Sequence, residues 1–204
     1  MILSPYNPAW ITEFAALQSV YAAALGHLIM RIEHVGSTAV PLLRAKPILD
    51  IDIVIENYDF LPQIVERLSK LGYQHSGNQG ILHREAFKPA DDKVPYTLPH
   101  REWMRHHLYV CPVYSAELHR HIAFRDSLRI RADWRREYEK IKESISIRSN
   151  GDRRIYAQIK EVECRNFVEL VLNETEPNQA LEPTRMLVTD PAAQAPRQAP
   201  VRLI

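Results

Sequence analysis

Residues 48–55 read Ile-Leu-Asp-Ile-Asp-Ile-Val-Ile, and residues 32–38 before them read Ile-Glu-His-Val-Gly-Ser-Thr. The later stretch is rich in β-branched residues, which favours a strand. Side chains two apart on a strand point to the same face, so Asp50 and Asp52 emerge together from an otherwise apolar element. A glycine–serine turn at 36–37 ends the preceding apolar run. We expect the turn and the paired acids to decide both the fold and the site.

Asp50 and Asp52 offer the hard oxygen ligands that divalent cations prefer, which predicts a site for Mg²⁺ or Mn²⁺. Gly36 lets a phosphate approach the backbone, and Ser37 with the start of the following turn supplies hydrogen-bond donors. The alternative for the acids is that one of them caps a helix or pairs with a nearby lysine or arginine. The alternative for the turn is an ordinary strand-to-helix connection with a serine or threonine cap.

The composition excludes several classes of protein. The chain has 204 residues, of which 46% are hydrophobic and 25% charged, and its net charge is +1. One domain with a real core is expected, and no charge bias favours nucleic acid or membranes as partners. No apolar run approaches the ~20 residues of a membrane span, and residues 1–5 lack the features of a signal peptide. Cys111 and Cys164 show no metal-type spacing, so we expect a reduced, cytoplasmic protein.

The apolar spacing predicts strands in the first half of the chain and helices in the second. Strands followed by helices favour an α+β domain. A polar loop with prolines at 88–101 is long enough to suggest a lid or an insertion. The expected strands are 29–34, 48–55, 73–75, 81–87 and 107–111, and the expected helices are 11–28, 60–71, 118–128, 134–145 and 155–170.

The composition changes from about residue 175. Residues 176–204 contain five prolines but no aromatic residue and no glycine. Such a segment buries too little apolar surface to offset the entropy of ordering it. We therefore predict a folded domain over residues 1–174 and a disordered tail, rich in proline and alanine, over residues 175–204.

Two longer motifs resemble a known family. Residues 33–41, Glu-His-Val-Gly-Ser-Thr-Ala-Val-Pro, and residues 45–52, Ala-Lys-Pro-Ile-Leu-Asp-Ile-Asp, resemble the GrpB family. By fold this family belongs to the nucleotidyltransferase superfamily, so the resemblance implies a mixed β-sheet with flanking helices and a helical C-terminal half. The resemblance covers residues 5–172 and includes further matches at 6–10, 106–108 and 124–129.

The resemblance also implies a site. The superfamily's signature is a Gly-Ser turn followed at a short distance by an acid-x-acid strand, and residues 36–37 and 50–52 match it. Active members usually add a third carboxylate from a neighbouring strand, but the expected strand 107–111 contains none. The GrpB pattern has a His-x-His pair there, and this chain reads His-Leu-Tyr at 107–109. His107 is therefore the candidate metal-ligating or acid–base group, with a buried structural histidine as the alternative.

Three basic side chains are candidate phosphate ligands. Lys46 lies close to the acids in sequence, and Arg125 and Arg129 are four apart on one side of an expected helix. The alternatives are a solvated lysine, and arginines that tie neighbouring elements together. A structural role of that kind is expected for Asp126, and ion pairing for Glu33.

These features leave three functions open. The first is metal-dependent transfer of a nucleotidyl group from a nucleoside triphosphate to an unknown acceptor, with Asp50 and Asp52 as metal ligands and His107 assisting. The second is a module that binds a nucleotide or a phosphorylated small molecule without turning it over, which the missing third carboxylate favours. The third is an interaction scaffold. A metal–nucleotide complex that stabilises the protein would separate the first two from the third.

Overall fold

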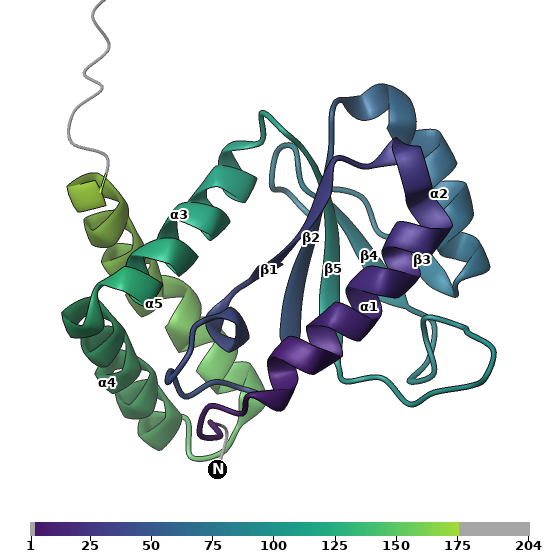
Figure 1. The fold of residues 1–204 in the computed structure, drawn as a ribbon. Helices are drawn as coiled ribbons and strands as arrows, with labels where there is room; N and C mark the ends of the chain where they lie inside the picture. The colour runs from purple at the N-terminus through teal and green to yellow at the C-terminus, as the bar shows by residue number, and fades with distance from the viewer. Residues whose placement is uncertain (1–2, 176–204) are drawn as a thin grey trace, which may run out of the picture.

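The computed structural model describes residues 3–175 of the chain. A five-stranded sheet with the order β1-β2-β5-β4-β3 forms its centre (Figure 1). The neighbours β2 and β5 are parallel and all other neighbours are antiparallel, so the sheet is mixed. In chain order the elements are α1 (Ala9–Leu25), β1 (Arg31–Val35), β2 (Leu49–Ile55), α2 (Leu61–Lys70), β3 (Tyr73–His75), β4 (Glu85–Pro89), β5 (His106–Pro112), α3 (Ala116–Ile130), α4 (Ala132–Arg148) and α5 (Arg153–Thr175).

One face of the sheet carries the larger apolar core. Strand β2 turns Leu49, Ile51 and Ile53 to this face, and all three are fully buried. Helices α1 and α2 close the core with residues that recur at helical spacing, such as Leu17 of α1 and Ile64 of α2. Alternation along β2 therefore separates an apolar face from the face that holds the acids.

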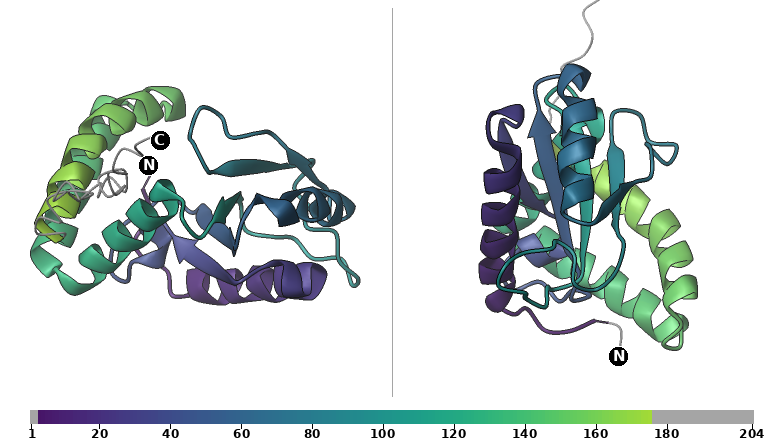
Figure 2. Two further views of the ribbon diagram at one scale, coloured as in Figure 1. Left: turned by 90° about the horizontal axis from the view of Figure 1, so that it is seen from above. Right: turned by 90° about the vertical axis from the view of Figure 1, so that its right-hand side faces the viewer.

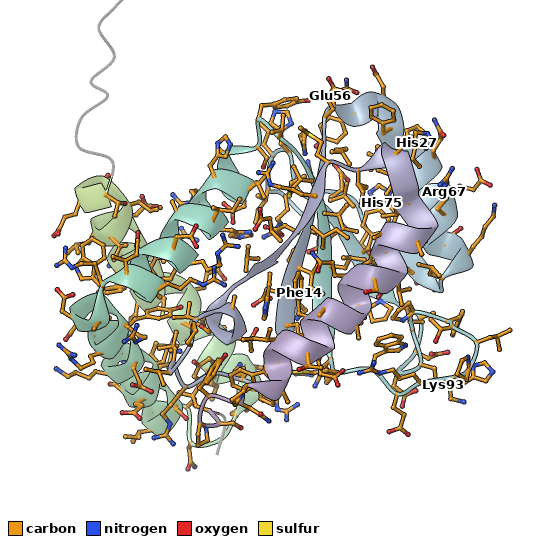
Figure 3. The ribbon with its side chains drawn as sticks, in the orientation of Figure 1. Phe14, His27, Glu56, Arg67, His75 and Lys93 are labelled. Carbon is orange, nitrogen blue, oxygen red and sulfur yellow. The ribbon has the colours of Figure 1, made fainter. Side chains whose placement is uncertain are left out.

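Two contacts fix α1 in place. Phe14 of α1 stacks on His34 of β1 with ring centroids 4.7 Å apart. Arg67 of α2 donates to the carbonyls of Ala24 and Leu25 at the end of α1, at 3.0 and 3.3 Å (Figure 3). In the side view α1 and α5 lie on opposite sides of the sheet (Figure 2). The face that α1 leaves uncovered is thus the face toward α5.

The last three helices form a second core beyond the β1 edge (Figure 1). The side-chain oxygen of Ser115 caps α3 by accepting from the Leu118 N–H at 3.3 Å, and Asp152 caps α5 by accepting from the Arg154 N–H at 2.7 Å. The shared core includes Tyr138 of α4 and Phe167 of α5, whose rings stack at 5.6 Å.

The α+β class, the mixed sheet with flanking helices and the helical C-terminal half are confirmed. The expected strand 81–87 is wrong over its first four residues, because β4 begins at Glu85. His83 has φ +59° and Gln79 has φ +51°, values that no strand residue adopts. The loop at 88–101 packs against the sheet core through Val94, which is 2% exposed. Helix α5 runs through Thr175, and the rest of the predicted tail lies outside the described residues.

Among the helices of residues 3–175, none has the length and apolar character needed to cross a membrane.

Candidate functional site

The polar face of β2 lies between acidic, histidine and tyrosine side chains of its two neighbours. Asp50 pairs in register with Val35 of β1 and His107 of β5. Asp52 pairs with Glu33 of β1 and Tyr109 of β5. Residues directly opposite on adjacent strands share a face, so two rows of side chains cross the sheet here.

Gly36 brings the turn after β1 against Asp50. Its φ is +71°, and a Cβ at this position would lie 2.2 Å from Oδ2 of Asp50. Only glycine fits such a close approach in this backbone conformation. Gly36 is the N-cap of the 3₁₀ turn Ser37–Ala39, so Ser37 is the first residue of that turn. The turn predicted from the sequence and the first acid are therefore in direct contact.

Asp50 is the accessible acid of the pair. Its side chain is 34% exposed, and its Oδ1 is 2.8 Å from Nδ1 of His107. Burial opposes ionisation of this carboxyl, but the hydrogen bond and charge of His107 outweigh burial and hold the pKa of Asp50 below its ordinary value. Asp50 is therefore the carboxylate that a ligand in the cleft meets.

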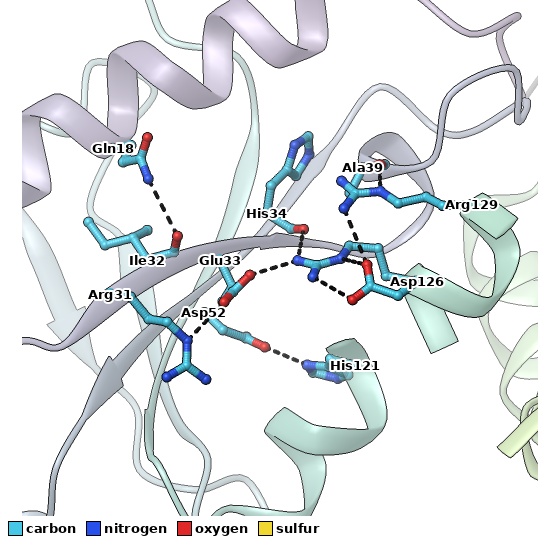
Figure 4. Close-up of polar contacts among 11 residues, drawn as sticks. Gln18, Arg31, Ile32, Glu33, His34, Ala39, Asp52, His121, Asp126 and Arg129 are labelled. Carbon is cyan, nitrogen blue, oxygen red and sulfur yellow. Dashed lines mark hydrogen bonds and ion pairs between the residues drawn. The ribbon is translucent and has the colours of Figure 1, made fainter. Parts of the chain in front are cut away.

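Asp52 is the buried acid. Its side chain is 0% exposed, and its Oδ2 is 2.7 Å from Nδ1 of His121 on α3 (Figure 4). Its Oδ1 is buried and has no hydrogen-bond partner among residues 3–175. Burial raises the pKa of Asp52 against the opposing effect of His121. A buried oxygen without a partner is costly, so a further interaction with this atom would stabilise the protein.

His121 is a site residue that the sequence analysis missed. Its Nε2 lies 3.2 Å from Glu117, so both ring nitrogens contact carboxylates. Burial would lower the pKa of His121, but the hydrogen bonds with Asp52 and Glu117 raise it to about 10. The available signal was the spacing of Glu117, His121 and Arg125, which lie four apart on one side of α3.

Arg125 and Arg129 bind the protein itself. Nη1 of Arg125 donates to Glu33 at 2.7 Å and to the carbonyl of His34 at 3.0 Å, and its other nitrogens bind Asp126 (Figure 4). Nε of Arg129 donates to the carbonyl of Ala39 at 3.0 Å. These bonds tie α3 to β1 and to the turn after Gly36. The ion-pairing roles expected of Asp126 and Glu33 agree with this geometry.

Two cavities meet at the accessible acid. The smaller has a volume of about 330 Å³ and the larger about 700 Å³, and Ser37, Asp50 and Lys160 line both. Gly36 and Arg125 line the smaller cavity, while Lys46 and His107 line the larger. The predicted site residues therefore line one or both cavities, with two exceptions. Asp52 is buried, and neither Asp52 nor Arg129 lines a cavity.

The two acids supply too few donor atoms to hold a cation by themselves, so a bound phosphate ligand would have to supply the others. Within residues 3–175, no group of three or more His, Cys, Asp or Glu side chains is arranged to hold a metal ion. Mg²⁺ is usually bound through one or two protein carboxylates, with phosphate oxygens and water in its other positions. Asp50 and the unpartnered Oδ1 of Asp52 match that donor set.

Comparisons with known proteins identify relatives of the chain. It is 36% identical to the UPF0157 protein PA4798 of Pseudomonas aeruginosa over 157 residues, which are 77% of this chain and 62% of that protein. It is 28% identical to the UPF0157 protein YqkA of Bacillus subtilis over 76% of this chain and 43% of that protein. The chain therefore matches less than two thirds of the length of either relative.

A solved structure and a family model complete the comparison. The crystal structure of the conserved protein GrpB from Enterococcus faecalis superposes with a TM-score of 0.69 at 24% identity, over 85% of this chain and 99% of that chain. This likeness shows that the two chains share a fold. The family model described as "GrpB protein" matches residues 1–172. The chain belongs to the GrpB family.

Proposed function

We propose that this protein binds a nucleoside triphosphate together with Mg²⁺ or Mn²⁺ and transfers the nucleotidyl group to an acceptor. The observation that carries this proposal is the close contact between Gly36 and Asp50, where a Cβ would lie 2.2 Å from Oδ2. Phosphates held by the turn would lie beside Asp50, and Asp52 follows two residues later on the same face of β2. When bound, the cation would neutralise charge on the phosphate oxygens.

The turn binds and orients the phosphates. Gly36 carries no side chain, so a phosphate oxygen can reach the backbone N–H groups of the turn. Ser37 adds a hydroxyl donor at the wall that both cavities share. Positioning and charge stabilisation are the main contributions that a protein makes to phosphoryl chemistry.

His107 is the candidate proton acceptor. Its Nδ1 contacts Asp50, its side chain is 53% exposed, and it lines the larger cavity. In the proposed step the acceptor's hydroxyl oxygen bonds to the α-phosphorus, pyrophosphate leaves, and the hydroxyl proton moves to Nε2 of His107. Asp50 fixes the orientation of the imidazole, as carboxylates do in histidine-based catalysis.

His121 and Glu117 position the buried acid. The 2.7 Å bond from His121 holds one oxygen of Asp52, so the other oxygen keeps a fixed direction. Glu117 in turn holds the far side of the imidazole at 3.2 Å. This chain of contacts would preorganise Asp52 before any ligand binds.

A second candidate function is binding without turnover. It is favoured by the absence, among residues 3–175, of a third acid or histidine arranged with the two aspartates to hold a metal. The same cleft would then hold a nucleotide or a phosphorylated small molecule as a ligand rather than as a substrate.

Thermal unfolding tests the binding step. We expect Mn²⁺ or Mg²⁺ with one of the four ribonucleoside triphosphates to raise the melting temperature, because a ligand at 100 times its Kd adds about 2.7 kcal/mol. For a chain of this size that corresponds to roughly 5–10 °C. The double variant Asp50→Asn, Asp52→Asn should show no rise. Asp92→Asn, an exposed acid in the loop after β4, is the matched control and should keep it.

Pyrophosphate release separates the two functions. With the nucleotide that stabilises the protein, a cell extract should supply the acceptor and produce pyrophosphate with wild-type protein but not with the double variant. A nucleotide-dependent rise in melting temperature without pyrophosphate would favour the binding module. No rise with any nucleotide would rule out nucleotidyl transfer and nucleotide binding, but not binding of a phosphorylated small molecule.

A further inference from the structure

Cations outnumber acids in the lining of the larger cavity. Among the described residues, the acidic side chains of this lining come from Asp50 and Glu161 alone. Helices α4 and α5 supply most of the positive charge, and the segment before β2 and the residue before β5 supply the rest. The cationic lining residues are Lys46, Arg105, Lys142, Arg153, Lys160 and Arg165.

Four of these cations have no acidic partner among residues 3–175: Lys46, Arg105, Arg153 and Lys160. Lys46 instead lies over the ring of Tyr156, with Nζ 3.9 Å from the centroid. Burial lowers the pKa of Lys46, and the nearby charges of Lys160 and Arg153 lower it further because they repel its ammonium group. Such a cluster favours a bound anion.

The smaller cavity contains fewer cations without an acidic partner. Its arginines are paired within the protein: Arg84 and Arg120 both lie near Glu117, at 3.8 and 3.5 Å, Arg125 binds Glu33 at 2.7 Å, and Arg165 binds Glu161 at 3.2 Å. Lys160 lines both cavities, whereas Lys46, Arg105 and Arg153 line the larger one and not the smaller. Most of the unpaired positive charge of the cleft therefore belongs to the larger cavity.

The larger cavity also extends to the place where the proposed nucleotidyl transfer would occur. Ser37 and Asp50 form the wall between the two cavities, and His107 lines only the larger one. A molecule in the larger cavity would therefore present its hydroxyl to His107, next to phosphates held on the turn at Gly36.

We propose that the larger cavity is the acceptor subsite and that it takes a small molecule carrying a phosphate. This proposal rests on the proposed function. Lys46, Arg105 and Arg153 bind the phosphate, and the acceptor's hydroxyl faces His107. A volume of about 700 Å³ suits a ligand of the size of a sugar phosphate, because small-molecule sites occupy roughly 300–1,000 Å³.

Calorimetric titration with ribose 5-phosphate tests the proposal, with ribose as the uncharged comparison. We expect wild-type protein to bind ribose 5-phosphate and not ribose. The double variant Lys46→Gln, Arg153→Gln should bind it about tenfold or more weakly, because each charge-assisted hydrogen bond contributes about 1.5–3 kcal/mol. Lys88→Gln, Arg154→Gln removes the same charge from exposed positions outside the cavity and should bind normally.

The rise in melting temperature caused by a nucleotide with its cation tests the proposed function separately from the acceptor subsite. Weakened sugar-phosphate binding with an intact nucleotide effect in the Lys46, Arg153 variant supports the acceptor subsite. Three results would overturn it: no binding to wild-type protein, equal affinity in the two double variants, or joint loss of sugar-phosphate binding and the nucleotide effect. The last would assign these cations to the nucleotide's own phosphates.

Failure of the proposed function looks different. In that case wild-type protein binds ribose 5-phosphate but no nucleotide changes its melting temperature. If the Lys46, Arg153 variant loses its fold by circular dichroism, the single variant Arg105→Gln replaces it, because Arg105 lines the same cavity from the residue before β5.

Discussion

The sheet half of the molecule (α1, α2 and the five strands) and the helical half (α3, α4 and α5) bury charges of opposite sign. The sheet half packs aliphatic side chains such as Leu49, Ile51 and Ile53 in its core and also buries the acid Asp52, which is 0% exposed. The helical half buries the cations Lys142 and Arg125, which are 1% and 9% exposed. The first half is therefore an apolar platform that carries a buried acid, while the second half buries cations.

This difference accounts for the charge distribution in the cleft. The sheet half contributes the two acids on the polar face of β2, and the helical half contributes Lys160 and Arg153 on α5. A rigid platform holds the acids at fixed positions, since dense apolar packing leaves side chains in single rotamers. The helical half brings positive charge to face them.

The largest loss of stability is expected from a substitution in the apolar core of the sheet half. Ile51→Ala should lower the free energy of unfolding by roughly 4 kcal/mol, because it leaves a cavity under β2 that the flanking strands cannot fill. Equilibrium unfolding in urea measures this change. Ile147→Ala removes the same atoms from a residue of α4 that is 79% exposed, and it should change stability by less than about 0.5 kcal/mol. Similar losses in both variants would contradict the comparison.

The junction between the halves should be nearly as sensitive. Gly36→Ala should cost roughly 2–3 kcal/mol, because the new Cβ combines a disfavoured φ with a clash against Asp50. It should also remove the nucleotide effect on the melting temperature. Gly26→Ala is the matched control: its φ is +55° and nothing lies within 4 Å of the added Cβ, so it should cost roughly 1–2 kcal/mol and keep the nucleotide effect.

The sequence predicts the sheet half well, because apolar residues alternate along a strand and recur at helical spacing along a helix, and both patterns indicate which side is buried. The strand over 48–55 is confirmed as β2, and the three late helices are confirmed. The strand expected over 81–87 is wrong over residues 81–84 because nothing in its apolar residues signals that His83 adopts φ +59°. Positive φ is uncommon at residues other than glycine, so the pattern of apolar residues does not predict it.

The site is predictable only where its residues are close in sequence. The turn at 36–37 and the acids of 50–52 stand out as motifs, and they meet in the fold. His121 contacts Asp52 from 69 residues away, and no local pattern marks that pairing. Lys160 is likewise brought to the cleft by the packing of α5. Long-range partners of this kind follow from topology, which periodicity does not encode.

A smaller change is expected in the helical half, where a substitution should increase the free energy of unfolding. Burial lowers the pKa of Lys142 to about 7, below its ordinary value of 10.5. The charged form is therefore penalised in the folded protein, and the wild type loses stability as pH falls from 10.5 to 7. Lys142→Met should be more stable than wild type by roughly 1–2 kcal/mol at pH 7 and below.

Unfolding measured across this pH range checks the sign. The advantage of Lys142→Met should shrink as pH rises toward 10.5, where the lysine is neutral in both states. Lys140→Met, an exposed lysine on the same helix, should give a difference that does not vary with pH. A variant at 142 that is less stable than wild type at every pH would show that the hydrogen bond to the Arg44 carbonyl outweighs the buried charge.

The smallest change in stability is expected from His34, a buried histidine of the sheet half, and it falls in a different pH range. Burial lowers the pKa of His34 from 6.5 to about 4, while its ring stacks on Phe14 and lies 3.0 Å from Oγ1 of Thr38. The stability that neutral His34 contributes is present above pH 6.5 and is lost as pH falls toward 4. Wild type should thus lose roughly 1 kcal/mol between about pH 7 and pH 5.5, and His34→Gln, which can keep the bond to Thr38, should lose less. Parallel curves for the two proteins in urea unfolding over this range would show that His34 is not the group whose titration couples pH to folding here.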